Sequence, residues 1–226
     1  MLDNFELITS YLKKVESEIK LDRSYDNIVW YLQILKRKKD NPDTVESNTV
    51  VIKDYYFNSA DEMLDKKENI IKYCVDNNAR AYIRLNPRCN SSVIKQMLKD
   101  SVAALDICSS IKLNKIISGA VGNSSIPKSY GNFKTWIIDI DTKDREFIDE
   151  VKCSILGIVH DYMSAEYFEE FSKSMFEIPT KNGVHVICKP FNLKQLGERF
   201  ADLKSAKRFA DFVDIHKDNP TILYIP

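Results

Sequence analysis

The sequence lacks several features that would assign it to a common class of protein. None of its five cysteines forms a C-x-x-C pair, and its three histidines are not spaced as zinc ligands, so a zinc module is not expected. No apolar run approaches the ~20 residues that span a bilayer. The N-terminal stretch MLDNFELITSYLKK is amphipathic and acidic early, unlike a signal peptide. Scattered cysteines in odd number suit a reducing compartment, and we therefore expect a cytoplasmic protein with no membrane segment.

The sequence also lacks an excess of either charge, with 33 basic and 33 acidic residues among 226. This balance argues against general coating of nucleic acid, although it leaves room for a local basic groove. No internal repeat is present, and the length allows one large domain or two small ones. No G-x-x-x-x-G-K-[ST] motif occurs, so any associated helicase would be a separate chain.

What the sequence does contain is a mixture of helical and strand patterns in both halves, which predicts an α+β or α/β class. We predict helices at 3–20, 25–39, 59–77, 91–108, 143–155 (capped by Thr142) and 192–203 (capped by Asn192), with a looser helical region to about residue 172. Predicted strands are 49–57, 79–86, 134–141, 174–178, 183–190, 212–216 and 221–225, and the turn PTKN joins two of them as a hairpin. The turn-rich segment 119–132 is the expected boundary between modules 1–118 and 119–226.

The segment FKTWIIDIDTKD, residues 133–144, raises the first question of chemistry. Side chains of a strand alternate between its faces, so Asp139 and Asp141 point to one side and Ile138 and Ile140 to the other. Two adjacent carboxylates repel each other unless a cation lies between them, and a divalent metal ion is the usual solution. Alternatively, the aspartates only cap the helix that follows.

Three further segments carry polar residues in strands. His185 follows the turn PTKNG and fits a phosphate-binding or acid/base group, or a half-buried histidine beside a hairpin. Asp214 lies in FVDIHKD, where it is a possible carboxylate ligand or a turn former. In ARAYIRLNPR, Arg80 and Arg84 share a strand face with Tyr82, which suits a nucleic-acid backbone or an ordinary solvated face.

The order of these segments resembles the archaeo-eukaryotic primase superfamily, the primase-polymerases. The family's first motif is an apolar run followed by D-x-D, here WIIDID, and its second is a small residue before x-His, here Gly183-Val184-His185. The third is an apolar residue followed by Asp or Glu, here Val213-Asp214, although Asp211 and Asp218 compete for that place. The likeness covers about residues 130–220.

The resemblance implies an RRM-like catalytic half with a mainly antiparallel sheet, packed beside a smaller N-terminal α/β module. It implies two-metal nucleotidyl transfer that makes or extends a DNA or RNA primer on a single-stranded template from nucleoside triphosphates. Mg²⁺ or Mn²⁺ would be held by Asp139, Asp141 and Asp214. The incoming triphosphate would be bound by His185, with help from Lys181 and Lys217. We also expect a basic face for template made by Arg80, Arg84 and Arg88.

Other classes remain open at this point. The segment DIDT resembles the D-x-D-x-T motif of haloacid-dehalogenase-like phosphatases, but Lys143 stands where that motif needs threonine. A D-x-D glycosyltransferase would begin with a nucleotide-binding βαβ unit, where two helices are predicted here. A non-catalytic replication or nucleic-acid binding protein with a primase-like fold is the third alternative.

Overall fold

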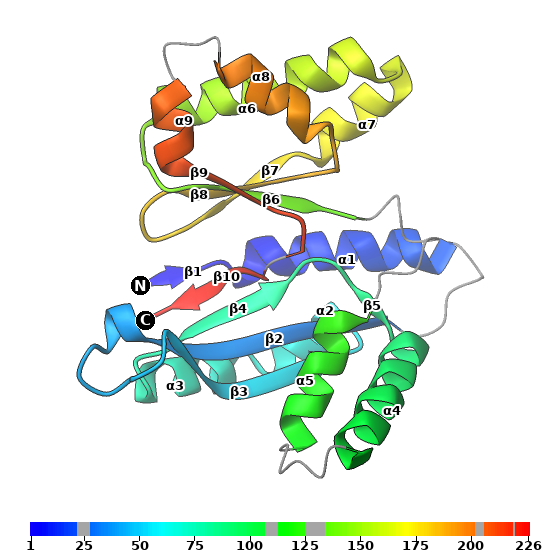
Figure 1. The fold of residues 1–226 in the computed structure, drawn as a ribbon, viewed down its shortest axis with the longest axis vertical. Helices are drawn as coiled ribbons and strands as arrows, with labels where there is room; N and C mark the ends of the chain where they lie inside the picture. Colours follow the sequence, from blue (N-terminus) through cyan, green and yellow to red (C-terminus); the bar gives the residue numbers. More distant parts are fainter. Residues whose placement is uncertain (22–27, 107–112, 125–133, 202–205, 219) are drawn as a thin grey trace. The chain divides into compact units, whose positions relative to one another are not determined.

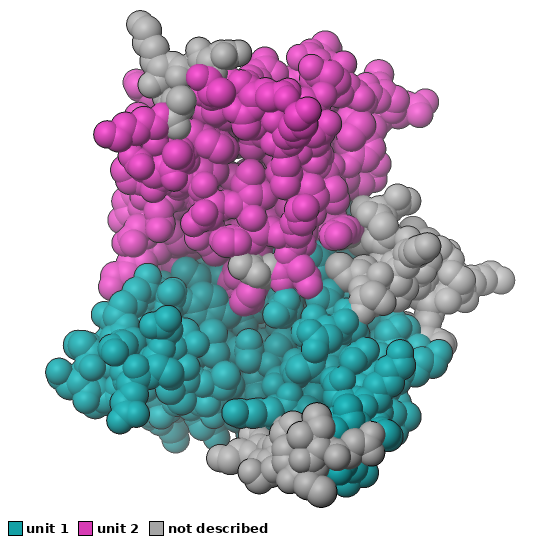
Figure 2. All heavy atoms as spheres, in the orientation of Figure 1, with its two compact units in different colours: residues 1, 3–131, 222–226 teal, residues 2, 132–221 magenta. Residues whose placement is uncertain are grey.

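The computed structural model describes the chain except residues 22–27, 107–112, 125–133, 202–205 and 219. It is an α+β protein with antiparallel sheets, as the mixed pattern predicted. Two compact units are present (Figure 2): unit 1 comprises residues 1, 3–131 and 222–226, and unit 2 comprises residues 2 and 132–221. Within the described residues, no helix is both long and apolar enough to cross a membrane.

Unit 1 is built on a sheet with the strand order β1 (Leu2–Asp3), β10 (Pro220–Ile225), β4 (Arg80–Arg84), β2 (Ile28–Arg37) and β3 (Thr49–Phe57). The short strand β5 (Arg88–Cys89) also pairs with β2, and β2 runs antiparallel to β3, β4 and β5. The other elements of this unit are α1 (Phe5–Leu21), the 3₁₀ turn η1 (Lys38–Asp40), α2 (Ala60–Asp65), α3 (Lys67–Asp76), α4 (Asn90–Asp106) and α5 (Leu113–Asn123).

The predicted second helix, 25–39, is wrong, because residues 28–37 form strand β2 and the 3₁₀ turn η1 follows it. Residues 28–34 are apolar except for Gln33, and Trp30, Leu32 and Ile34 are fully buried on one face. Tyr31, on the opposite face, is also buried. Burial on both faces removes the alternation that marks a half-exposed strand, so the apolar residues of this run also fit a helical period.

Unit 2 follows the order strand, helices, strand, strand, helices, strand. Its elements are β6 (Trp136–Ile140), α6 (Arg145–Tyr162), α7 (Ala165–Ser174), β7 (Phe176–Pro179), β8 (Val184–Cys188), α8 (Leu193–Ala201), α9 (Ala206–Phe212) and β9 (Val213–His216). The sheet order is β7-β8-β6-β9, and every neighbouring pair is antiparallel. The four helices lie on one face of this sheet (Figure 1), where Ile138, Ile140 and Val186 pack against Phe147 and Phe171.

Several local predictions are confirmed by the capping contacts. The hydroxyl of Ser59 accepts from the amide of Glu62, although the predicted helix is divided at Lys66 into α2 and α3. Asn192 accepts from the amide of Lys194 at the start of α8. The predicted cap of α6 is wrong, because Asp144 accepts from the amides of the first turn while Thr142 accepts from the amide of Asp144.

The division between the units lies at 131/132 instead of the expected 118/119. The reason is α5, which extends to Asn123 and packs against α4 of unit 1, although its glycines read as turn signals. Among the described residues, no atom lies within 4 Å of a Cβ built on Gly119 or Gly122, so no described neighbour requires glycine at either position. In addition, residues 222–226 return to unit 1.

Candidate functional site

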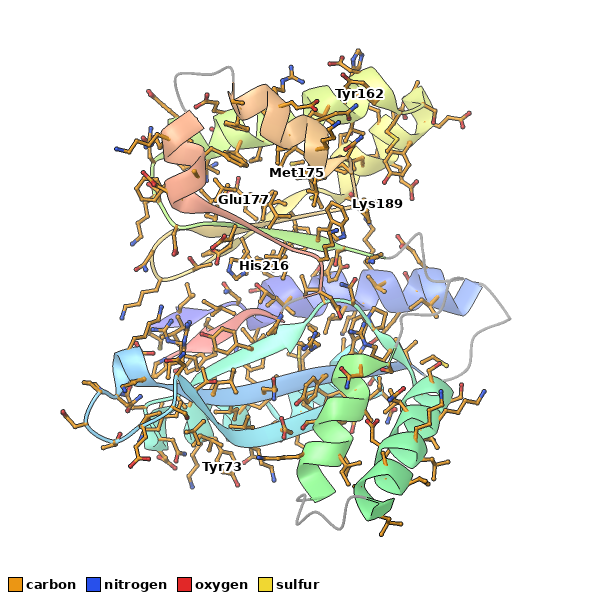
Figure 3. The ribbon with its side chains drawn as sticks, viewed as in Figure 1. Tyr73, Tyr162, Met175, Glu177, Lys189 and His216 are labelled. Carbon is orange, nitrogen blue, oxygen red and sulfur yellow. The ribbon has the colours of Figure 1, made fainter. Side chains whose placement is uncertain are left out.

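Strand β6 separates apolar and polar side chains between the two faces of its sheet. Trp136, Ile138 and Ile140 join the core beneath the helices. Asp139 therefore projects from the opposite face, where its side chain is 29% exposed. Figure 3 shows His216, which pairs with Ile137 of β6, on this second face, and Glu177 on the face that carries the helices.

The register of the sheet aligns one residue from each of the three sequence motifs. Asp139 lies directly opposite His185 on β8 and directly opposite Asp214 on β9. Directly opposed residues of paired strands project from the same face. Asp139, His185 and Asp214 therefore form one row across three neighbouring strands, which we call the polar row.

His185 is the buried member of the polar row. Its ring lies between two oxygen atoms: Nε2 is 3.3 Å from Oδ1 of Asp139, and Nδ1 is 2.7 Å from Oγ1 of Thr221. Its side chain is 8% exposed, and Thr221 is fully buried. Sequence reasoning missed Thr221, which lies 36 residues further along the chain and carries no motif.

The carboxylates of this site lie on one pair of strands. Asp139 and Asp214 face each other across β6 and β9, an arrangement in which like charges destabilise the sheet. Asp141 follows β6, and its amide donates to the carbonyl of Phe212 at 2.9 Å, which extends the same strand pairing. Both Asp141 and Asp214 are exposed. The register thus brings the backbones of all three predicted ligands together.

A metal site at these carboxylates stays a prediction. In the part of the chain that the structure describes, no three His, Cys, Asp or Glu side chains are close enough together to hold a metal ion. The donor chemistry nevertheless suits Mg²⁺ or Mn²⁺, since carboxylate oxygens are the ligands that hard divalent cations prefer. A cation would also relieve the repulsion between Asp139 and Asp214.

The turn between β7 and β8 lies directly against the D-x-D segment. It is closed by a bond from the amide of Thr180 to the carbonyl of Gly183 (2.9 Å) and by one from the amide of Gly183 to Oγ1 of Thr180 (3.0 Å). A Cβ atom on Gly183 would lie 1.8 Å from the carbonyl oxygen of Ile140 and 2.7 Å from the amide nitrogen of Thr142. The small residue of the second motif is therefore required by this approach of two backbones. Lys181 lies exposed on the same turn.

Three other predicted residues are not gathered at the polar row. Lys217 follows β9, and its Nζ lies 5.4 Å from the centroid of the Trp136 ring, at the opposite end of β6 from the D-x-D segment. Asp211 belongs to α9, and Asp218 lies in the bend after β9, so neither pairs with Asp139. Asp214 alone among the three competing aspartates holds that register. The nucleotide-binding role of Lys217 stays a prediction.

The arginines of unit 1 do not form the exposed basic face that we expected. Arg80 is 4% exposed and pairs with Asp40, and Arg88 is 2% exposed and donates to the carbonyl of Val121. Arg84 is half-buried at the end of β4. Two of the three guanidinium groups are thus committed to contacts within unit 1, and a role for these arginines in binding template stays a prediction.

One ion pair that the sequence did not reveal lies beside the D-x-D segment. Arg208 of α9 binds the carboxylate of Asp144, the N-cap of α6, and its Cζ atom lies 4.5 Å from the centroid of the Phe147 ring. The hydrogen bond from Arg208, together with that from the amide of Phe147, lowers the pKa of Asp144 below its usual value. These contacts attach the loop after Asp141 to two helices.

Comparisons of the chain with family models, with curated protein sequences and with solved structures found no match.

Proposed function

We propose that this protein is a primase-polymerase-like nucleotidyltransferase, which makes or extends a DNA or RNA primer on a single-stranded template. The observation that carries the proposal is the polar row, because it aligns the key residues of the three motifs on neighbouring strands. The strand and helix order of unit 2, with its antiparallel sheet, supports an RRM-like catalytic half.

Each residue of the site has a role in this proposal. The carboxylates of Asp139, Asp141 and Asp214 would hold Mg²⁺ or Mn²⁺, and the metal would supply charge neutralisation at the reacting phosphate. The Nε2 edge of His185 faces the side of the sheet that carries Asp139, where it would donate to a triphosphate oxygen. Lys181, on the turn against the D-x-D segment, would balance phosphate charge.

The second candidate is a non-catalytic nucleic-acid binding protein with the same fold. It is favoured by one observation: among the described residues, the side chains do not form a ready-made metal ligand set. The glycosyltransferase alternative requires a parallel nucleotide-binding unit near the N-terminus. The predicted helix there is strand β2, which runs antiparallel to all three strands with which it pairs.

The decisive assay is primer synthesis and extension on a single-stranded template, with Mn²⁺ and all nucleoside triphosphates. We expect Asp139→Asn to abolish product formation, because the amide keeps the shape and loses the charge that binds metal. The matched control is Asp65→Asn, an exposed position in α2, which should leave activity unchanged. His185→Ala should raise the apparent KM for nucleotide as well as slow the reaction.

Metal binding is measured separately by thermal unfolding. Mn²⁺ should raise the melting temperature of the wild type and of Asp65→Asn, but not that of Asp139→Asn. Without metal, Asp139→Asn should melt no lower than the wild type, since the repulsion from Asp214 is removed. Absence of product together with absence of any Mn²⁺ effect would refute the enzyme and favour the binding protein. A Mn²⁺ effect without product would indicate a missing partner, such as a separate helicase.

A further inference from the structure

The two polar contacts of the His185 ring together indicate which ring nitrogen carries the hydrogen. Nε2 is 3.3 Å from a carboxylate oxygen of Asp139. An ionised carboxylate can only accept hydrogen bonds, so this approach is favourable when Nε2 bears the hydrogen. In the neutral ring, Nδ1 is then an acceptor, and the hydroxyl 2.7 Å away must be the donor.

We infer that Thr221 is a positioning residue, whose hydroxyl donates to Nδ1 of His185 and thereby keeps the Nε2–H edge on the face that carries Asp139. Both residues belong to unit 2, of which Thr221 is the last residue.

On the buried side of the His185 ring, the hydroxyl of Thr221 is the group that is hydrogen-bonded to Nδ1. On the neighbouring strand β7, the residue directly opposite His185 is Ile178, which is fully buried and offers no polar side-chain atom. On the other neighbour, β6, the opposite residue is Asp139, whose Oδ1 lies near Nε2. In the other neutral tautomer, a lone pair on Nε2 would face the carboxylate of Asp139. A ring flipped about its Cβ–Cγ bond would lose the hydrogen bond between Nδ1 and the Thr221 hydroxyl, so this bond opposes the flip.

The functional consequence rests on the proposed nucleotidyl transfer. If His185 donates to the triphosphate, a ring fixed by Thr221 presents one oriented donor, whereas an unfixed ring divides its population between tautomers and orientations. Loss of the hydroxyl should therefore weaken nucleotide binding about fivefold to tenfold, as expected for a neutral hydrogen bond. The apparent KM should rise by this factor, and kcat should fall less.

The experiment combines ¹⁵N NMR of histidine-labelled protein with nucleotide kinetics. In the wild type, the His185 ring should show the Nε2–H tautomer; a ring with its proton on Nδ1 would overturn the inference without any variant. Thr221→Val keeps the shape and removes the hydroxyl, so the His185 ring should no longer show a single tautomer and the apparent KM should rise. Thr221→Ser keeps the hydroxyl, so it should show the single tautomer and the apparent KM of the wild type.

The matched control is Thr9→Val, because Thr9 is also buried but its hydroxyl has no hydrogen-bond partner among the residues that the structure describes. It should leave the spectrum of His185 unchanged. An unchanged tautomer in Thr221→Val, or its loss in Thr221→Ser, would refute the positioning role. The spectrum does not depend on catalysis. A Thr221-dependent tautomer in a protein that neither forms product nor responds to Mn²⁺ would therefore reject the proposed function and retain the positioning residue.

Discussion

Replacement of Gly183 by alanine should be among the most damaging single-methyl changes available in unit 2. The added Cβ would lie 1.8 Å from the carbonyl oxygen of Ile140, whereas ordinary contact begins at 3.4 Å, so the backbones must separate by about 1.6 Å. The obstructing atoms belong to the main chain and cannot rotate away. The shift would strain the two hydrogen bonds of the turn at Thr180 and the pairing of Val184 with Ile140. With about 1 kcal/mol for each of the two turn bonds and about 1–3 kcal/mol for overpacking, we expect a loss of about 3–5 kcal/mol in the free energy of unfolding.

The assay is urea unfolding followed by ¹⁹F NMR of fluorotryptophan, which reports the units separately. The chain has two tryptophans, Trp30 in unit 1 and Trp136 in unit 2. The transition of the Trp136 signal should move to lower urea in Gly183→Ala. The control is Gly197→Ala, in the middle of α8, where no atom of the described residues lies within 4 Å of the built Cβ. Its helix should gain about 0.5–1 kcal/mol. A Gly183→Ala variant as stable as the wild type would refute the argument that the turn is packed on the D-x-D segment.

Two further predictions concern ion pairs away from the polar row. The guanidinium of Arg145, and with it the ammonium of Lys152, lowers the pKa of Glu177 from 4.5 to about 2. The full difference corresponds to about 3 kcal/mol, which screening at this partly exposed site reduces to about 1 kcal/mol. This stabilisation is present above pH 4.5 and is lost as the pH falls towards 2. Glu177→Gln should therefore lower the urea midpoint at pH 7, and the midpoint of the variant should fall less steeply in acid than that of the wild type. If the two midpoints fall in parallel with pH, this assignment is contradicted. Arg80→Ala should destabilise unit 1 by about 3 kcal/mol, because it leaves the Asp40 carboxylate, 18% exposed, without its guanidinium; an unchanged urea midpoint would show that the pair contributes nothing.

Most elements that are bounded by clear capping or turn signals could be predicted from the sequence. The strand TVVIKDYYF, the Ser59 cap and the β7–β8 hairpin each carry a local signal whose physical basis lies within a few residues. Strand β2 could not be recognised, because it is buried on both faces and its apolar residues fit either period. Helix α5 was missed because glycines inside a helix resemble turn signals.

The site divides in the same way. The alternation of WIIDID predicted that Asp139 lies on the face away from the core. The order of the motifs favoured Asp214 among three nearby aspartates, and the register of β6 and β9 agrees with this choice. Thr221 and Arg208 could not be predicted, because their contacts join residues 36 and 64 positions apart. The burial of Arg80 likewise depends on Asp40, which is 40 residues away.

The return of residues 222–226 to unit 1 makes unit 2 an inserted domain. Strand β10 lies inside the sheet, between β1 and β4, and the amide of Asn4 donates to the carbonyl of Leu223. During synthesis, the sheet of unit 1 therefore remains open until the whole of unit 2 has been made, whereas residues 132–221 already contain every strand of the second sheet. Unit 2 can therefore form its sheet before unit 1 completes its own. A fragment that stops at residue 131 would expose the edges of β1 and β4, which are normally paired with β10.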